Sequence, residues 1–207
     1  MSILFKKLIL KRAVPILILS VLFSCKFSEK PKGENTIPIP KKPNILWLVT
    51  EDMGQYLPSF GDNTVLTPNL SRLANEGIRY PNVFSPSGVC APSRAAIATG
   101  MYPSSIGANH MRTTSYTEVT GLPKYEAVPP PEVKMFSELL RMQGYFCTNN
   151  AKNDYQFKAP VTGWNQNGKK AHWKNRAKGQ PFFSIFNFNV THESGLFEPY
   201  ERAIAIH

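Results

Sequence analysis

An uninterrupted apolar run, I-L-W-L-V, extends from Ile45 to Val49 and has polar residues on both sides. A run of this kind, without alternation, is typical of a strand that is buried on both faces of a parallel sheet. The run is followed by Thr50, Glu51 and Asp52. Ligand sites of open α/β sheets lie beyond the carboxyl ends of such strands. We therefore expect Glu51 and Asp52 at the edge of a binding site.

The next pattern predicts a helix and then a strand. Thr67 can cap the helix, Pro68 suits its first position, and Gly77 can end it. The apolar residues of this helix share one face, as expected where a helix covers a core. β-branched and aromatic residues then predict a strand over about residues 78–84.

A second helix is expected to begin just after Cys90, at the end of a loop over residues 85–89. Pro92 suits its first turn, alanines continue it, and Gly100 ends it. The unpaired N–H groups at such a helix start favour an anion. Arg94, one turn into the helix, adds further donors that suit a tetrahedral oxyanion.

The second half of the chain continues the alternation of helices and strands. Residues 101–131 predict mostly loop because they are rich in proline, glycine, threonine and tyrosine. A helix over about residues 133–143 and a strand over 145–149 follow, and the last strand is expected over 182–190. The basic segment before it predicts a loop with a short helix around residues 172–176. The whole pattern predicts an α/β fold, a mostly parallel sheet with helices on both faces.

The start of the chain does not fit this domain. Lysines precede an apolar run from Ala13 to Phe23, which is too short to cross a membrane and is typical of a secretory signal. The residues L-F-S-C that end at Cys25 resemble a bacterial lipobox, in which the cysteine is lipidated. A cleaved signal without lipid and an uncleaved anchor are the alternatives.

We expect three regions: a lipoprotein signal peptide (1–24), a flexible tether (25–42) and the α/β domain (43–207). The tether assignment rests on its prolines, glycine and lysines and on its lack of an apolar period. A lipidated Cys25 would place an exported protein in the bacterial cell envelope, in the periplasm or at the outer membrane, with the lipid as its membrane contact.

Composition and charge exclude little. Of the 207 residues, 42% are hydrophobic and 12% are aromatic, which is enough for a core. The formal net charge is +10, but four basic residues precede Cys25, which leaves 20 basic against 14 acidic residues, or +6. The segment from Lys169 to Lys178 carries five basic residues and no acid. A solvated surface and a polyanion site both explain it, and we expect no nucleic-acid partner.

Three cysteines, at positions 25, 90 and 147, form no disulfide framework. Cys147 falls in a predicted strand and is expected to be a buried thiol without chemistry. Cys90, taken by itself, fits an inert buried thiol as well as a reactive group.

The string from Cys90 to Gly100 decides between these alternatives. It reads C-A-P-S-R-A-A-I-A-T-G and resembles the sulfatase signature, C-x-P-S-R followed by four residues and T-G. The resemblance implies that a formylglycine-generating enzyme oxidises Cys90 to formylglycine, whose hydrate is the nucleophile. It covers roughly residues 43–194 and implies an alkaline-phosphatase-like fold.

The same resemblance assigns roles to the other polar strand ends. Glu51 and Asp52 resemble the family's calcium ligands, which together with the oxygen of modified Cys90 would hold Ca²⁺. Glutamate stands where the family more often has aspartate, so Asp52 is the stronger candidate.

Three more residues match catalytic positions of the family. Lys152 matches a lysine that contacts both the sulfate and the nucleophile. Asp154 stands where histidine is common, and its carboxylate can accept a proton from the hydrate. His192 matches the histidine close to the ester oxygen and could protonate the leaving alcohol. His110 and Arg112 are candidate substrate-binding residues.

The resemblance implies hydrolysis of sulfate esters, or N-sulfates, of an anionic glycan such as a glycosaminoglycan or an algal polysaccharide. The strings T-H-E-S and A-H-W-K-N-R resemble the heparan-sulfamidase-like branch. A phosphodiesterase or phosphonate hydrolase of the same superfamily is the enzymatic alternative. A catalytically inactive, surface-anchored glycan-binding lipoprotein is the alternative of another class.

The family completes its calcium site with an Asp-Asn pair and its sulfate pocket with a lysine, both much further along the chain. We therefore expect that this sequence is the N-terminal part of a longer sulfatase, truncated and inactive alone. A natural short form is the alternative.

Overall fold

The computed structural model describes residues 41–111, 117–121, 123, 125–197 and 199. The chain divides into two units, Met1–Pro40 and Lys41–His207, and every described residue belongs to the second. The predicted signal peptide, the lipidated Cys25 and nearly all of the tether lie outside the described residues, so these assignments stay predictions. Within the described ranges, no helix has the length and hydropathy that crossing a membrane requires.

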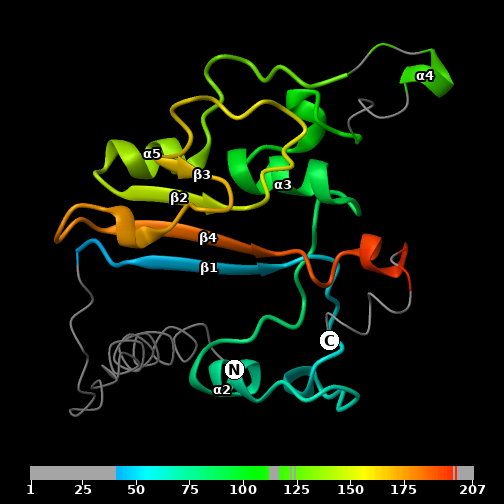
Figure 1. The fold of residues 1–207 in the computed structure, drawn as a ribbon, viewed down its shortest axis with the longest axis vertical. Coiled ribbons are helices and arrows are strands. Elements are labelled where there is room, and N and C mark those ends of the chain that lie inside the picture. The colour runs from blue at the N-terminus through cyan, green and yellow to red at the C-terminus, as the bar shows by residue number, and fades with distance from the viewer. Residues whose placement is uncertain (1–40, 112–116, 122, 124, 198, 200–207) are drawn as a thin grey trace, which may run out of the picture. The chain divides into compact units, whose positions relative to one another are not determined.

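A four-stranded sheet holds the described residues together (Figure 1). Its order is β1 (Ile45–Thr50), β4 (Phe182–Phe188), β2 (Phe146–Asn150) and β3 (Gln166–Asn167). Every pairing in it is parallel, so the carboxyl ends of β1, β4 and β2 lie at the same edge. The parallel sheet predicted from the sequence is confirmed, although β2 begins and ends one residue later than expected and the short β3 was not predicted.

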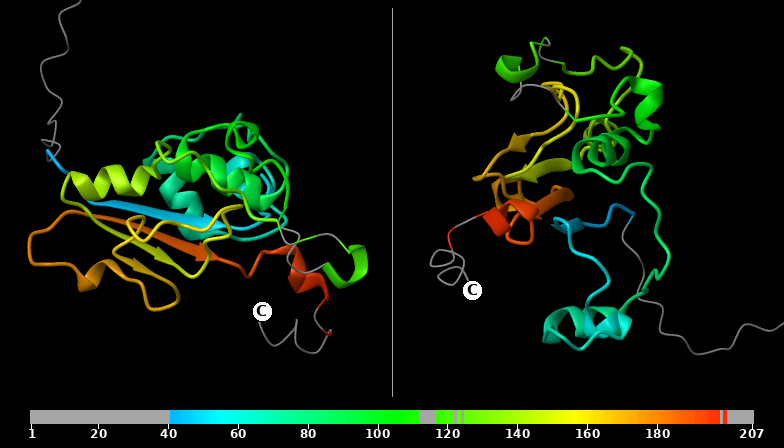
Figure 2. Two further views of the ribbon diagram at one scale, coloured as in Figure 1. Left: turned by 90° about the horizontal axis from the view of Figure 1, so that it is seen from above. Right: turned by 90° about the vertical axis from the view of Figure 1, so that its right-hand side faces the viewer.

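Helical elements cover both faces of this sheet (Figure 2). The helices α3 (Cys90–Thr99) and α5 (Phe136–Met142) pack on one face. There, Phe183 of β4 meets Phe136 and Trp47 with ring centroids 5.0 and 5.1 Å apart. The 3-10 turn η3 (Trp173–Asn175) covers the other face, where Trp173 stacks on Phe182 at 5.5 Å.

The expectation that β1 is buried on both faces is wrong. Leu46 and Leu48, which point away from α3 and α5, are 45% and 56% exposed. β1 is at the edge of the described sheet, and η3 contacts the aromatic rings of β4. A continuous apolar run favours a strand, but it does not say what covers each face of that strand.

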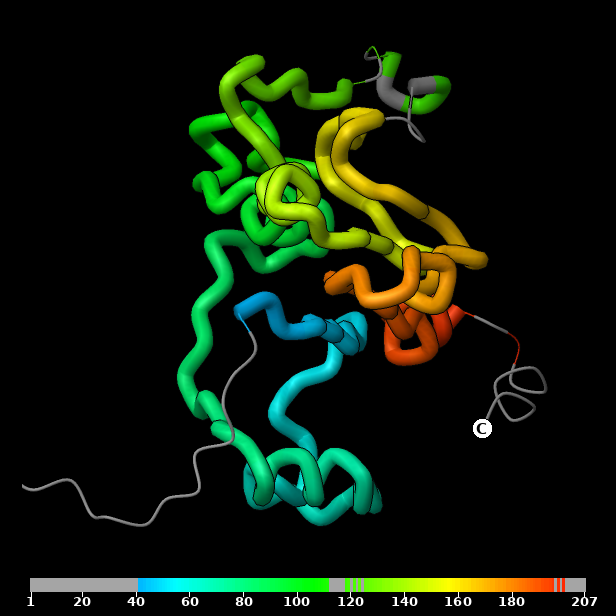
Figure 3. Tube along the Cα trace, turned by 90° about the vertical axis from the view of Figure 1, so that its left-hand side faces the viewer, coloured from blue at the N-terminus to red at the C-terminus, as the bar shows by residue number. Residues whose placement is uncertain are grey.

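The strand predicted over residues 78–84 is also wrong. The segment between α2 (Pro68–Glu76) and α3 has no regular structure (Figure 3), and Val83 and Phe84 are 77% and 90% exposed. Residues with high β-propensity form a strand only where a neighbouring strand pairs with them through backbone hydrogen bonds. None of the described strands pairs with this segment. α2 itself is confirmed, but it buries none of its residues.

Smaller differences concern helix ends and loops. α5 is shorter than predicted, and its Leu139 is 52% exposed. The loop over residues 101–131 contains two short helices, and a 3-10 turn follows β4. These are η2 (Pro103–Ile106), α4 (Thr117–Thr120) and η4 (Glu193–Phe197), and a further turn, η1 (Pro58–Phe60), packs against α2.

Candidate active site

The helix α3 presents Cys90 at its very first position, one residue earlier than the sequence pattern predicts. Val89 is the extended residue before it, and Gly100 ends the helix in a left-handed conformation with φ 69°. Ala95 and Ala98 are buried, and their small side chains let the helix lie close to the sheet. The packing of α3 therefore fixes the start of the helix, and with it Cys90, near the carboxyl edge of the strands.

Arg94 joins this helix to three other segments. Its Nε donates to the carbonyl oxygen of Asn153 at 3.1 Å, and its Nη1 donates to Glu51 Oε1 at 2.8 Å. Its Nη2 donates to the Lys152 carbonyl at 2.9 Å and to Asn187 Oδ1 at 2.6 Å. A guanidinium has five N–H donors. Within the described chain four of them are committed, and one N–H on Nη1 remains for an external oxyanion.

Glu51 carries the negative charge that balances this group of cations. Its Oε1 is paired with Arg94 and its Oε2 with Lys152 Nζ at 2.9 Å, and its side chain is only 6% exposed. Burying a carboxylate is costly unless it is paired, and here both oxygens are paired. Sequence reasoning expected Glu51 as a calcium ligand, whereas the structure shows it as the partner of two cations.

Cys90 lies next to a second carboxylate. Its Sγ is 3.3 Å from Asp154 Oδ2, and the same oxygen is 3.6 Å from Lys152 Nζ. Burial, and then the hydrogen bond and the charge of Asp154, raise the pKa of the Cys90 thiol above its ordinary value, and Lys152 only partly opposes them. The unmodified thiol is therefore protonated at neutral pH and is a poor nucleophile.

Two asparagines that sequence reasoning missed complete this cluster. Asn149 of β2 and Asn187 of β4 are 0% and 7% exposed. Asn187 contacts Arg94 directly, and its Nδ2 donates to Asn149 Oδ1 at 3.0 Å. The sequence holds one sign of this cluster: Asn187 stands between the phenylalanines of the last predicted strand. An amide in a buried strand needs polar partners, so its position indicates a polar contact there.

The structure offers only part of the expected calcium site. Among the described residues no group of three histidine, cysteine or acidic side chains is placed to hold a metal. Asp52 is exposed, and its Oδ2 accepts the N–H of Glu193 at 2.9 Å. Carboxylate oxygens suit Ca²⁺, but both oxygens of Glu51 already pair with cationic side chains, those of Arg94 and Lys152. The described residues therefore do not complete a site for this ion.

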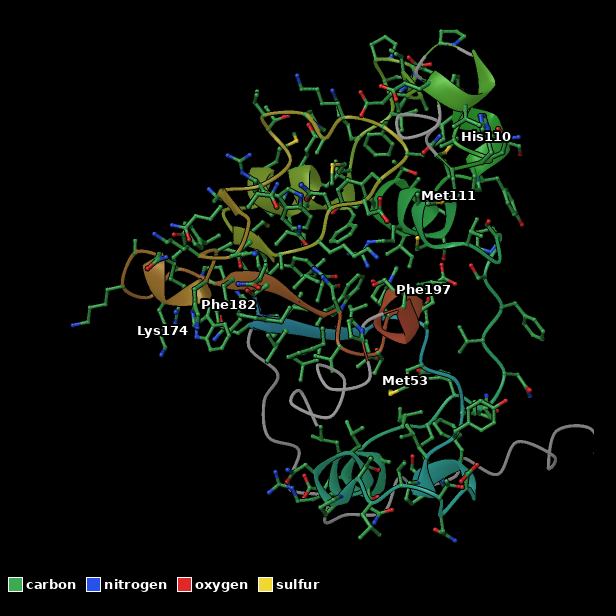
Figure 4. The ribbon with its side chains drawn as sticks, turned by 45° about the vertical axis from the view of Figure 1, so that its right-hand side comes forward. Met53, His110, Met111, Lys174, Phe182 and Phe197 are labelled. Atoms are coloured by element: carbon green, nitrogen blue, oxygen red, sulfur yellow. The ribbon has the colours of Figure 1, made fainter. Side chains whose placement is uncertain are left out.

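None of the described hydrogen bonds joins the side chain of His192 or His110 to this cluster. His192 follows β4, and its Nδ1 accepts the N–H of Ser194 at 3.1 Å, so the neutral ring carries its proton on Nε2. Its segment is tied to the first strand end, because Thr191 Oγ1 donates to the Glu51 carbonyl. His110 stacks on Tyr125 at 4.6 Å, beside Met111 (Figure 4). Arg112 lies outside the described residues.

Comparison with known proteins agrees with this geometry. The sequence model of one family, described as Sulfatase, matches residues 43–170, which is more than half of the chain. The chain belongs to the sulfatase family. The family resemblance drawn from the Cys90–Gly100 string is thus confirmed.

The curated relatives of this sulfatase are much longer than the chain. It is 65% identical to an ulvan-active sulfatase of Formosa agariphila over 192 residues, which are 90% of this chain and 32% of that protein. It is 40% identical to human N-acetylgalactosamine-6-sulfatase over 113 residues, 51% of this chain and 20% of that one. The chain therefore spans about a third or less of these relatives.

Solved structures confirm the fold of this sulfatase. One, in complex with its substrate D-glucosamine-2-N,6-O-disulfate, matches 80% of this chain and 37% of its own with a TM-score of 0.59 and 23% identity. Another, in complex with a neocarrahexaose, matches 80% of this chain and 48% of its own with a TM-score of 0.61 and 20% identity.

The thiol of this sulfatase can be titrated if the chain is made without the modifying enzyme. We expect alkylation of Cys90 by iodoacetamide to have a higher pH midpoint than that of a free cysteine, because burial and Asp154 disfavour the thiolate. Asp154→Asn should lower that midpoint, since it removes the adjacent negative charge. Peptide mapping supplies an internal control, because burial raises the pKa of Cys147 to about 12. A Cys90 midpoint equal to or below that of free cysteine would contradict the described environment.

Proposed function

We propose that this protein hydrolyses sulfate esters of an anionic glycan, with a formylglycine derived from Cys90 as the nucleophile. The observation that carries the proposal is the position of Cys90 at the first residue of α3, in contact with Asp154 and one turn before Arg94. A protonated, partly buried thiol is poorly suited to nucleophilic attack. This supports the proposal that the reactive group is the aldehyde used by the family and not the thiol.

The residues around Cys90 fit the handling of a sulfate group. When it is present, hydrated formylglycine supplies one hydroxyl that attacks sulfur and a second whose deprotonation allows sulfate to leave. Asp154 is placed to accept that proton, since its Oδ2 already contacts the Cys90 side chain. Lys152, next to Asp154, and the N–H groups at the start of α3 would stabilise negative charge on the sulfuryl oxygens.

Leaving-group protonation is assigned to His192. Ser194 orients its ring through Nδ1, and the imidazolium form would give its Nε2 proton to the leaving alcohol. General acids of this type contribute roughly 100- to 10,000-fold to a rate. Ca²⁺, the ion that the sulfatase family generally uses, is the proposed cofactor and would contact Asp52. We assign it no step, because the carboxylate of Glu51 is committed to Arg94 and Lys152.

The substrate proposal rests on the relatives. The 65% identical relative is described as an ulvan-active sulfatase, so ulvan is the first substrate to test. Glucosamine sulfates follow, because a solved structural neighbour binds one as its substrate. His110 and Arg112 remain the proposed substrate-binding residues, and the exposed lysines of the segment Lys169 to Lys178 are a proposed secondary contact for a sulfated chain.

Export and modification complete the proposal. The partners are a formylglycine-generating enzyme, which acts on Cys90, and the bacterial cell envelope, which a lipid on Cys25 would contact. Palmitate labelling in the native host tests the second point. Loss of label in Cys25→Ala, with export retained, would support lipidation, and equal labelling of both proteins would contradict it.

The function is tested with the protein isolated from its native host. We expect mass spectrometry to find formylglycine at Cys90, and kcat/KM for an aryl sulfate to exceed that for the matching aryl phosphate by at least about 100-fold. A reversed preference would favour the phosphodiesterase or phosphonate hydrolase alternative. An intact thiol together with no hydrolysis of either ester would favour the inactive glycan-binding alternative.

A further inference from the structure

The carboxyl ends of β2 and β4 carry a connected pair of buried amides, Asn149 and Asn187. Asn149 pairs in register with Ile185. Asn187 is two residues further along β4 and therefore lies on the same face of the sheet. Asn187 Nδ2 bonds to Asn149 Oδ1 at 3.0 Å and to the carbonyl of Asn150 at 2.8 Å. Buried amides are tolerated where their hydrogen bonds are satisfied, and this pair has donors and acceptors engaged on both residues.

The loop that leaves β2 beside this pair has an unfavourable backbone. Lys152 N donates to the Asn150 carbonyl at 3.2 Å around Ala151, whose φ is 74°, and Asp154 has φ 42°. A three-residue turn with positive φ at a residue other than glycine is rare and strained. Such conformations persist only where surrounding contacts determine them, and they are frequent at functional sites.

The amide pair supplies those contacts. Asn149 Nδ2 donates to the Lys152 carbonyl at 3.0 Å and to Asn153 Oδ1 at 2.8 Å. Asn187 Nδ2 reaches the same Lys152 carbonyl at 3.3 Å, while its Oδ1 accepts from Arg94. The carbonyl of Lys152 is thus held by Arg94 and by both amides.

We infer that Asn149 and Asn187 are positioning residues, which hold the strained loop so that Lys152 and Asp154 face Cys90. The inference rests on the proposed function, since it deepens the account of the same site. Neither amide is within hydrogen-bonding distance of Cys90. Their effect is transmitted through Arg94 and through the backbone of residues 150–153.

The test compares Asn187→Leu with Asn175→Leu in the full-length protein. Leucine is close to asparagine in size but lacks the amide. Asn175 is the matched control, because its Nδ2 donates to Gln166 Oε1 at 2.8 Å and none of its described hydrogen bonds reaches Asn149, Asn187 or residues 151–154. We expect Asn187→Leu to speed amide hydrogen exchange of residues 151–154 at least about tenfold, with the exchange of β1 unchanged. Equal exchange of residues 151–154 in wild type and Asn187→Leu would overturn the inference.

Kinetics on an aryl sulfate supply the second readout, normalised to the formylglycine content of each preparation. We expect kcat of Asn187→Leu to fall by up to about 100-fold, as misplacement of reacting groups by 1 Å does, with KM changed less than threefold. Asn175→Leu should keep both values. A normal kcat with a loosened loop, or a lowered kcat with an unchanged loop, would also overturn the inference. If the wild type hydrolyses no sulfate ester, the proposed function fails while hydrogen exchange still decides the role of Asn187.

Discussion

Cys90→Ser is expected to reduce turnover of sulfate esters by at least about 1000-fold, more than the usual loss of one preorganised donor. Two chemical reasons combine. A modifying enzyme that requires cysteine leaves serine unconverted, and a simple hydroxyl lacks the second hydroxyl that expels sulfate. The measurement is kcat on an aryl sulfate, made together with mass spectrometry of the peptide that contains position 90.

The fold should tolerate this change. Serine at the first position of α3 can donate to Asp154 as the thiol does and suits a helix start. We therefore expect the melting temperature of Cys90→Ser to stay close to that of the wild type.

Cys147→Ser is the matched control, because Cys147 is fully buried and its Sγ contacts only the Ser137 carbonyl among the hydrogen-bond partners described. It should lower stability and keep the turnover per folded molecule. Substantial activity in Cys90→Ser, or its loss in folded Cys147→Ser, would refute the assignment of the nucleophile.

Arg94→Ala is expected to lower kcat by about 100- to 1000-fold, which corresponds to about 3 to 4 kcal/mol of transition-state stabilisation. The loss has two sources. The remaining N–H of Arg94 can no longer meet a sulfuryl oxygen. The loop with Lys152 and Asp154 also loses two hydrogen bonds, and Asn187 loses its bond to the guanidinium. Near-normal turnover in purified, fully modified Arg94→Ala would show that this residue is not catalytic.

Stability has to be separated from catalysis in this experiment. Arg94 and Glu51 are 12% and 6% exposed in their side chains, and removal of one partner of a buried pair costs about 3–5 kcal/mol. Lys152 still pairs with Glu51, so the lower end of that range is expected.

Arg94→Lys keeps the charge near Glu51 but cannot bond several acceptors in the geometry of a guanidinium. We expect it to recover much of the stability, measured by urea unfolding, and little of kcat. Recovery of kcat in step with stability would show that only the charge of Arg94 matters.

Much of the fold could be predicted because it depends on local interactions. Pro92, the alanines and Gly100 specify α3 within ten residues, and its boundaries were predicted to within one. The strands β2 and β4 were also found from short apolar and aromatic runs. The prediction failed for residues 78–84, because a strand needs a partner and local propensity does not supply one.

The members of the cluster were predicted only in part, and their arrangement was not predicted. Glu51, Arg94, Lys152 and Asp154 were all named from their places at strand ends or in the signature, and the structure brings them together with Cys90. Their partners could not be foreseen. Glu51 meets Lys152 across 101 residues of chain, and Arg94 meets Asn187 across 93.

The sequence by itself determined the family, the candidate nucleophile and the parallel α/β plan, because a short linear signature and local caps and runs carry that information. Only the tertiary structure decided that Glu51 is the counter-charge of two cations, that most N–H groups of Arg94 bond within the chain, and that Asn149 and Asn187 bond to the Lys152 carbonyl. These are contacts between the ends of parallel strands. Their geometry depends on strand order and register, which no local pattern of residues encodes.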